Sequence, residues 1–424
     1  MIRIVPLISV DASVAMTAPC ISSATPNRPT KPGRIFLDNG DSSPVSMWDQ
    51  RVLDPLNDSR PPVSLNPAPN RICIPTTRRP PYVGEGRLKS MDLNSATWMV
   101  RTLEQPVSAL HVTSENEVFA GGWDGRLTLW DDGGEHLWTA QTNDRISAVA
   151  LSEKAVVVAS GLHIVCLDRA SGEAMWSVAL EGSADEVVWW QGELVAVSSV
   201  YDIEHNDFIE SAIWRLSPEG EVLWVERMDE RPWALVQVGE QLLAGLGRPR
   251  CGCLDVSSAP PFTHVDSSTP FPTTAGSSGR TRGLFGQTDG TVTDHEGAVL
   301  STESGAVEHL TCMVKGYVAT TDDGHAVGRT EDGEACWEAK GAPVSAQTEA
   351  MELDGASQLW LARNEGTDSV VNVWASNHSD RRATGRFSRV RAMHGTPQRA
   401  AIGCEDGCLL YTSPSPRDTL LSRM

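Results

Sequence analysis

The segment Gly133-Gly-Glu-His-Leu-Trp138 recurs along the chain in close variants. The variants are Ser171-Gly-Glu-Ala-Met-Trp176, Glu219-Gly-Glu-Val-Leu-Trp224 and Asp332-Gly-Glu-Ala-Cys-Trp337, and we place Trp98 at the same position of the repeat without the glycine. The first four tryptophans, at 98, 138, 176 and 224, are separated by 40, 38 and 48 residues. A period near 40 residues, with several short strands in each repeat, predicts the blades of a β-propeller.

The first complete repeat shows the four strands of a blade, which we name a to d. Apolar residues recur in Val107–Val112, Val118–Gly122 and Arg126–Trp130, and strand d begins at Glu135. The turn Asp124-Gly125 supplies the positive φ that a tight hairpin requires. The same order of strands can be followed along the chain. We expect an all-β fold of eight blades, or of seven if the irregular stretch described below holds no blade.

The ring is expected to close through an N-terminal strand. Ala96–Leu103 matches strand d of the other repeats, and Arg389–Gly407 supplies strands a and b and the turn into strand c. A strand d contributed from the N-terminal side would cover sheet edges that are otherwise exposed. We therefore assign the propeller to residues 91–407.

The stretch Asp255–Arg282 breaks the repeat, because it is rich in Ser, Pro, Thr and Gly. Behind it, Gly283–Gln287 and Thr291–Asp294 fit strands b and c of a fifth blade. Two interpretations stay open for the stretch itself. It is either a long variable loop or the product of a local shift in reading frame.

Neither end of the chain follows the pattern. Residues 1–90 are crowded with Pro, Ser, Arg and Thr and show no apolar period, which predicts a disordered or non-native leader. The mildly apolar Met1–Ala18 is the one part of it that could direct export. Residues 408–424, most clearly Cys408–Asp418, resemble the translation of a transposase sequencing adapter. This resemblance implies a metagenomic fragment whose native propeller sequence ends near Gly407.

Composition and charge narrow the classes of partner. The formal net charge of −20 and the pI near 4.9 argue against nucleic acid, whose phosphates need a basic surface. The chain contains no run of about 18 apolar residues, so the sequence predicts no membrane span. The cysteines within residues 91–407 are scattered through strand-like stretches, as expected for small buried side chains in a reducing compartment. We expect a cytoplasmic protein, or a secreted or periplasmic one if the N-terminal apolar segment is a true signal.

Two segments resemble known repeat families. Gly161-Leu-His-Ile-Val-Cys-Leu-Asp-Arg-Ala-Ser-Gly-Glu-Ala-Met-Trp176 resembles the PQQ-like, quinoprotein-type repeat, and Gly122-Trp-Asp-Gly-Arg-Leu-Thr-Leu-Trp-Asp131 is closer to a WD40 repeat. Either resemblance implies a propeller over about residues 94–407. Quinoprotein enzymes bind a quinone with calcium, and many have an adjacent pair of cysteines. Here Gly252 separates Cys251 from Cys253, and no calcium-ligand motif can be matched.

No constellation of catalytic residues is recognisable between the repeats. There is no Gly-x-Ser-x-Gly elbow and no phosphate-binding loop, and Val299 stands where a zinc-protease motif beginning at His295-Glu296 would need its second histidine. Cys251-Gly-Cys253 has no second paired cluster that would complete a metal site. We assign no catalytic residue, no metal ligand and no cofactor.

One connection is much longer than its counterparts in the other repeats. Ser199–Ser211 joins strands b and c of the third blade and combines carboxylates and a histidine with two aromatic side chains. The binding candidates in it are Tyr201, Asp202, Glu204, His205, Asp207 and Phe208. Such a set could bind a cation or a basic partner, whereas the plainer interpretation is a solvated variable loop.

These observations favour a monomeric, non-enzymatic propeller that acts as a scaffold for an unknown protein partner. The repeat resemblance and the many tryptophans, which could stack on a flat cofactor, keep a PQQ-dependent dehydrogenase as one alternative. An envelope protein assembly factor is another, and it would require export.

Overall fold

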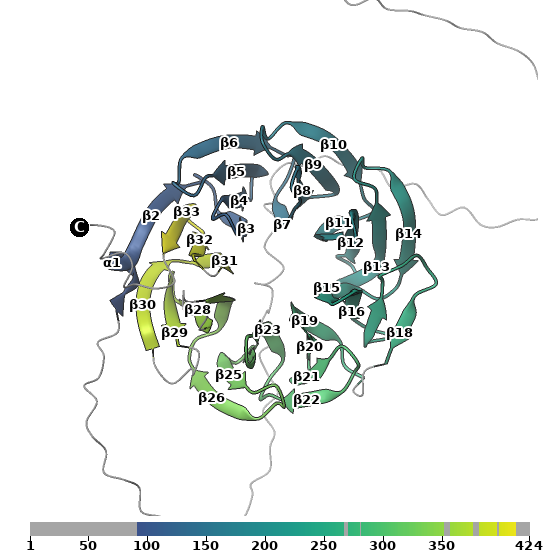
Figure 1. Ribbon diagram of the computed structural model, residues 1–424. Coiled ribbons are helices and arrows are strands. Elements are labelled where there is room, and N and C mark those ends of the chain that lie inside the picture. Colours follow the sequence, from purple (N-terminus) through teal and green to yellow (C-terminus); the bar gives the residue numbers. More distant parts are fainter. Residues whose placement is uncertain are drawn as a thin grey trace, which may run out of the picture. The chain divides into compact units, whose positions relative to one another are not determined.

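The computed structural model describes residues 91–266, 270–279, 281–351, 357–375, 381–396 and 398–412. The predicted leader, residues 1–90, and residues 413–424 lie outside the described residues. Within the described part, the strands form eight sheets arranged in a ring (Figure 1). The prediction of an eight-bladed all-β propeller is confirmed.

Each sheet is one blade, and Figure 1 shows its first strand at the centre of the ring and its last at the rim. Blade 1 contains β3 (Val107–Val112), β4 (Val118–Gly122), β5 (Arg126–Trp130) and β6 (His136–Gln141). Blade 2 contains β7 (Ile146–Leu151), β8 (Ala155–Ser160), β9 (His163–Asp168) and β10 (Ala174–Ala179). Blade 3 contains β11 (Ser183–Trp190), β12 (Glu193–Asp202), β13 (Asp207–Leu216) and β14 (Val222–Met228). Blade 4 contains β15 (Pro232–Val238), β16 (Gln241–Leu246), β17 (Cys253–Asp255) and β18 (Thr263–Val265).

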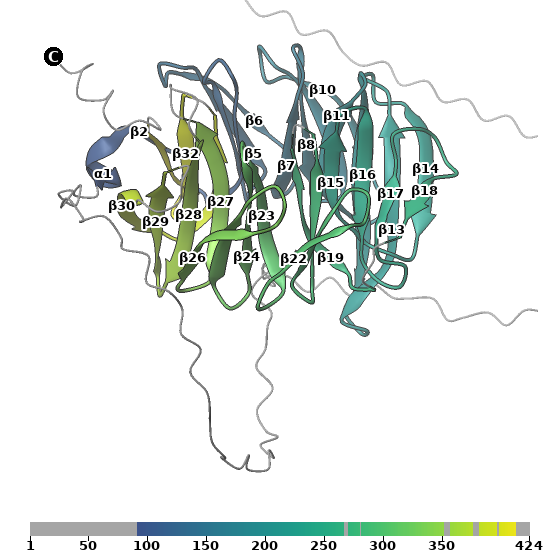
Figure 2. The same ribbon diagram turned by 60° about the horizontal axis from the view of Figure 1, so that its bottom comes forward.

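The second half of the ring repeats this order, and its strands run between the two faces of the ring (Figure 2). Blade 5 contains β19 (Thr273–Ser278), β20 (Gly283–Gln287), β21 (Thr291–Asp294) and β22 (Val299–Thr302). Blade 6 contains β23 (Val307–Met313), β24 (Gly316–Thr321), β25 (His325–Arg329) and β26 (Ala335–Lys340). Blade 7 contains β27 (Val344–Met351), β28 (Ser357–Glu365), β29 (Asp368–Trp374) and β30 (Arg381–Ser388), and β1 (Met91–Asp92) adds to it in parallel. The helix α1 (Leu93–Ala96) has four residues, and no helix of the described part is long and apolar enough to cross a membrane.

Blade 8 joins the two ends of the described chain. It contains β31 (Val390–Gly395), β32 (Ala400–Cys404), β33 (Cys408–Thr412) and β2 (Thr97–Thr102). The outer strand β2 pairs antiparallel with β33, as expected for closure by an N-terminal strand. The predicted boundary at Gly407 falls in the turn that leads into β33, so the blade continues five residues past it. The origin of residues 408–424 stays a prediction.

The repeated glycine and tryptophan serve the same inter-blade contact. Trp138 of blade 1 donates its Nε1 hydrogen to the Arg169 carbonyl in the outer turn of blade 2, at 2.9 Å. Its ring lies over Gly172 of that turn, where φ is +74° and a Cβ atom would come within 2.6 Å of the indole. Trp176 repeats the contact on Gly220 of blade 3. The glycines of the second and third motifs therefore receive the tryptophan of the preceding blade, whereas Gly134 meets Met99 and Gly333 meets Leu300.

The placement of Trp98 in this repeat position is wrong by one residue. A β-bulge at Trp98 puts Met99 opposite Tyr411, in the register that Trp138 has opposite Leu129. Met99 is 8% exposed and lies where a Cβ atom on Gly134 would be, whereas Trp98 is 39% exposed. The same bulge occurs at Leu137, directly before Trp138, so Trp98 is equivalent to Leu137 and the motif was aligned one residue off. A shift of one residue in a strand reverses the face that a side chain occupies.

The irregular stretch Asp255–Arg282 belongs to two blades. It supplies β18 (Thr263–Val265), the outer strand of blade 4, and β19 (Thr273–Ser278), the inner strand of blade 5. Reading all of it as one variable loop is therefore wrong for these strands. The strands predicted behind it are confirmed as β20 and β21. The reading frame of the stretch stays open.

Two histidines meet where blade 8 contacts blade 1. The rings of His111 and His394 stack with centroids 4.5 Å apart, and His394 Nδ1 accepts the Val112 N–H at 3.2 Å. Burial lowers the pKa of His394 to about 3, with a smaller effect from His111. Burial, helped by the charge of Arg169, also lowers the pKa of His111. Both rings are therefore held neutral in the folded ring.

We expect this pair to make the fold sensitive to acid. A histidine of the unfolded chain takes up a proton near pH 6.5, while His394 stays neutral down to about pH 3. Between these values the unfolded state binds more protons, so stability present above pH 6.5 is lost as the pH falls, by up to about 1.4 kcal/mol per pH unit. Urea midpoints measured from pH 7.5 to 4.5 should fall less steeply in His394→Gln than in the parent chain. Equal slopes would contradict the assignment.

Candidate functional site

The hairpin formed by β12 and β13 extends beyond the rest of blade 3. Strand β11 pairs with β12 only as far as Ser199, and β14 pairs with β13 only from Ser211. Between these residues the two strands pair only with each other, up to the turn at residues 203–206. A two-stranded ribbon by itself is marginally stable in water, so side-chain contacts must hold it. We call residues 200–210 the blade 3 hairpin.

The predicted binding residues all lie in this hairpin, although its form differs from the expected loop. Tyr201 and Asp202 end β12, Glu204 and His205 lie in the turn, and Asp207 and Phe208 begin β13. The stretch 199–211, predicted as a loop, is thus mostly strand. Pairing with the neighbouring strand satisfies backbone groups that a long loop would leave to water, which favours the ribbon.

The aromatic candidates come together. Tyr201 and Phe208 make an edge contact with ring centroids 5.2 Å apart, and Phe208 makes another with Trp233 of blade 4 at 5.8 Å. The Tyr201 hydroxyl donates to Asn206 Oδ1 at 2.6 Å across the turn. These contacts fix the ribbon against blade 4.

The polar candidates only partly converge. His205 Nδ1 lies 3.1 Å from Asp202 Oδ2, and the hydrogen bond from His205 lowers the pKa of Asp202. Asp207 accepts the backbone N–H of Phe208, and the Glu204 side chain has no partner among the described residues. In the described part of the chain no three His, Cys, Asp or Glu side chains are grouped to hold a metal ion. Binding of a cation by these residues stays a prediction.

An arginine that sequence reasoning missed anchors the hairpin. The Arg231 guanidinium carbon lies 3.8 Å from the Phe208 ring centroid and 4.1 Å from that of Trp233. Its Nη2 lies 3.2 Å from Asp185 Oδ2, and its side chain is 11% exposed. Burial lowers the pKa of Arg231, while Asp185 opposes this effect. Arg145 directly precedes the inner strand of blade 2, as Arg231 precedes that of blade 4, and it lies over Trp123. An arginine directly before an inner strand was therefore the signal in the sequence that could have pointed to Arg231.

Replacing Arg231 by alanine is expected to loosen the blade 3 hairpin while leaving the ring folded. A cation–π contact contributes about 0.5–2 kcal/mol, so loss of two should speed amide exchange in residues 200–210 about tenfold or more. Hydrogen exchange with mass spectrometry measures this. Arg145→Ala, the same change at the equivalent position of blade 2, should leave exchange in the hairpin unchanged. Equal exchange in all three proteins would show that Arg231 does not anchor the hairpin.

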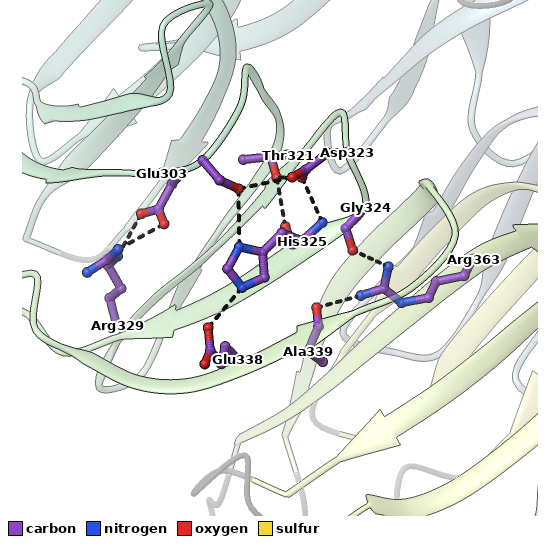
Figure 3. Close-up of polar contacts among 10 residues, drawn as sticks. Glu303, Thr321, Asp323, Gly324, His325, Arg329, Glu338, Ala339 and Arg363 are labelled. Atoms are coloured by element: carbon purple, nitrogen blue, oxygen red, sulfur yellow. Dashed lines mark hydrogen bonds and ion pairs between the residues drawn. The ribbon is translucent and has the colours of Figure 1, made fainter. Parts of the chain in front are cut away.

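A second polar cluster on blade 6 has the composition of a catalytic triad (Figure 3). Ser304 Oγ lies 3.2 Å from His325 Nδ1, and His325 Nε2 lies 3.0 Å from Glu338. The Ser304 hydroxyl, however, donates to Asp323 Oδ2 at 3.1 Å, and Glu338 is 71% exposed. A carboxylate thus holds the hydroxyl proton that a nucleophile would pass to the imidazole. We assign this cluster to fixing the turn before β23.

Neighbouring residues in the same view connect blades 5, 6 and 7. Glu303, in the connection from blade 5, receives two hydrogen bonds from Arg329 of β25, at 2.6 and 2.8 Å. Arg363 of blade 7 donates to the carbonyls of Gly324 and Ala339 in blade 6, at 2.6 and 3.1 Å (Figure 3). These contacts join adjacent blades, as the tryptophan contacts do in blades 1 to 3.

The comparisons with known proteins find similar folds among solved structures but do not assign this chain to a family. No protein-family model matches this chain, and no curated protein is similar to it in sequence. BamB from Moraxella catarrhalis superposes with a TM-score of 0.58 at 14% identity, covering 75% of this chain and 97% of that chain. The computationally designed Ika8 protein superposes with 0.57 at 15% identity, covering 74% and 98%. The WD40 β-propeller domain of Doa1 reaches 0.49 at 12% identity, covering 76% and 97%.

Proposed function

We propose that this chain is a non-enzymatic β-propeller scaffold that presents the blade 3 hairpin to a protein partner. The observation that carries the proposal is a protruding ribbon that is anchored and yet exposes apolar side chains. Ile203 is 85% exposed at its tip, and Ile209 and Tyr201 are 42% and 36% exposed. Exposed apolar groups on a preorganised element lose little conformational entropy on binding, which is typical of interaction surfaces.

The test compares baits that differ at one residue. We expect the parent chain to retain a defined partner from lysate of the source cell, and Ile203→Asp to lose it, because the charge removes the apolar contact. Leu162→Asp is the matched control, since Leu162 is 54% exposed in the corresponding turn of blade 2. Equal recovery by all three baits, or recovery of no partner, would contradict the proposal. Cell fractionation tests the proposed cytoplasmic location.

The two alternatives make separate predictions. A PQQ-dependent dehydrogenase would retain the quinone with calcium after reconstitution and would reduce a dye with an alcohol or sugar substrate. An envelope assembly factor would be exported, so it would be found in the envelope fraction. The structural similarity to BamB, at 14% identity, concerns the fold alone. The resemblance of single repeats to PQQ-like and WD40 repeats stays a prediction.

A further inference from the structure

A cavity of about 400 Å³ lies between blades 3 and 4. Among the residues that line it are Glu226, Met228, Asp229, Arg250, Leu254 and Phe262. Its volume falls in the range of about 300–1,000 Å³ found for ligand sites. Figure 1 shows β14 and β18, the outer strands of these two blades, as neighbours at the right of the ring.

The outer strands of blade 4 are short beside the cavity. β17 and β18 have three residues each, whereas β14, which faces them, has seven. The connection between β17 and β18, residues 256–262, contains no glycine, and Trp224 makes an edge contact with Phe262 of this connection, with ring centroids 5.4 Å apart. Pro261 and Phe262, from the connection between β17 and β18, line the cavity together with β14.

The lining combines two buried apolar side chains with an excess of negative charge, since Glu226, Asp229 and Glu230 outnumber Arg227 and Arg250. Met228 and Leu254 are 8% and 2% exposed. Both oxygens of Glu230 accept hydrogen bonds from Arg250 at 3.0 Å, and this contact lowers the pKa of Glu230. The positive charge of Arg250 is thus already used.

The other arginine of the cavity is also paired, whereas two of its carboxylates are not paired among the described residues. Arg227 is bound by Glu181, through Nε at 2.6 Å and Nη2 at 2.5 Å. Asp229 has no partner in the described part of the chain, and Glu226 has only a long-range interaction with Arg250. A cation entering the cavity would therefore meet two carboxylates without displacing either ion pair.

The cavity lies next to the base of the blade 3 hairpin. Met228, at the cavity, pairs with Ser211 at the base of the hairpin. Glu210 of the hairpin is close enough to Arg227 to affect its pKa. A polypeptide bound along the hairpin could thus place a side chain in the cavity.

We propose that the partner contributes an arginine side chain to this cavity, from a basic segment that lies against the blade 3 hairpin. This inference rests on the proposed scaffold function. A guanidinium matches the observations, since it can pair with the carboxylates of Glu226 and Asp229 and stack on the Phe262 ring. The acidic hairpin tip, with Asp202, Glu204 and Asp207, and the net charge of −20 favour a basic segment.

The experiment uses N-acetyl-arginine amide as the probe and N-acetyl-citrulline amide as its uncharged isostere. We expect the arginine probe to shift the amide resonances of residues 226–230, Leu254 and Phe262, with a Kd on the order of 1 mM. Glu226→Gln/Asp229→Asn should weaken binding about tenfold or more. Glu219→Gln/Glu221→Gln removes the same charge from another turn of blade 3 and should leave the Kd unchanged.

Three outcomes would overturn the inference. They are equal binding of the citrulline probe, an unchanged Kd in Glu226→Gln/Asp229→Asn, and shifts spread over the acidic surface instead of the cavity. The probe does not need the hairpin, so its binding is measured whether or not Ile203→Asp affects partner capture. Probe binding without a partner contradicts only the scaffold function. A partner that depends on Ile203 but not on Glu226 and Asp229 contradicts only the arginine contact.

Discussion

Replacing Trp138 by alanine is expected to lower the free energy of unfolding by about 3–5 kcal/mol. The indole is 7% exposed, packs over Gly172 of the next blade and donates a hydrogen bond to the Arg169 carbonyl. Alanine would leave a cavity between blades 1 and 2 and an unpaired carbonyl. Since a domain has a net stability of only about 5–15 kcal/mol, urea denaturation should show a large fall in the midpoint.

The chain offers a graded control for this result. Trp98→Ala changes the same residue type at the same part of the repeat, but its side chain is 39% exposed and the inter-blade position belongs to Met99. We expect a loss of about 1 kcal/mol or less for Trp98→Ala, and an intermediate loss for the partly buried Trp176→Ala. Similar midpoints for Trp138→Ala and Trp98→Ala would contradict the assigned register.

Replacing Glu303 by alanine is expected to cost about 3–5 kcal/mol as well. The side chain of Glu303 is 1% exposed and binds Arg329, which is itself 15% exposed, through two hydrogen bonds. Glu303→Ala would leave this guanidinium charge buried without its counterion between blades 5 and 6. Urea, which unlike guanidinium chloride does not screen charges, is the denaturant to use.

The matched control for this prediction is an exposed ion pair. Glu365 binds Arg386 at 2.8 Å, with side chains 46% and 53% exposed, so Glu365→Ala should cost under about 1 kcal/mol. The double variant Glu303→Leu/Arg329→Met should recover part of the stability, because it leaves no buried charge unpaired. If Glu303→Ala and Glu365→Ala behaved alike, the Glu303 pair would not be stabilising the ring.

The sequence by itself determined the architecture, because each blade other than blade 8 is built from contacts within about 40 residues. The Asp-Gly turns illustrate this. Asp124, Asp289 and Asp323 each accept the N–H two residues on, and the following glycines have φ between +78° and +89°. Such turns depend on neighbouring residues only, so their spacing predicted the strands on either side.

The tertiary structure decided which side chains meet across blades. The strand register placed Met99 where the motif suggested Trp98, and Arg231 joined Phe208 only because blade 4 lies beside blade 3. The cavity between these blades brings together Glu226 and Phe262, whose proximity no sequence pattern indicated. Contacts between blades depend on how the blades pack in the ring. Composition and spacing could therefore locate the blade 3 hairpin, whereas the position that Arg231 shares with Arg145 did not by itself show that Arg231 holds it.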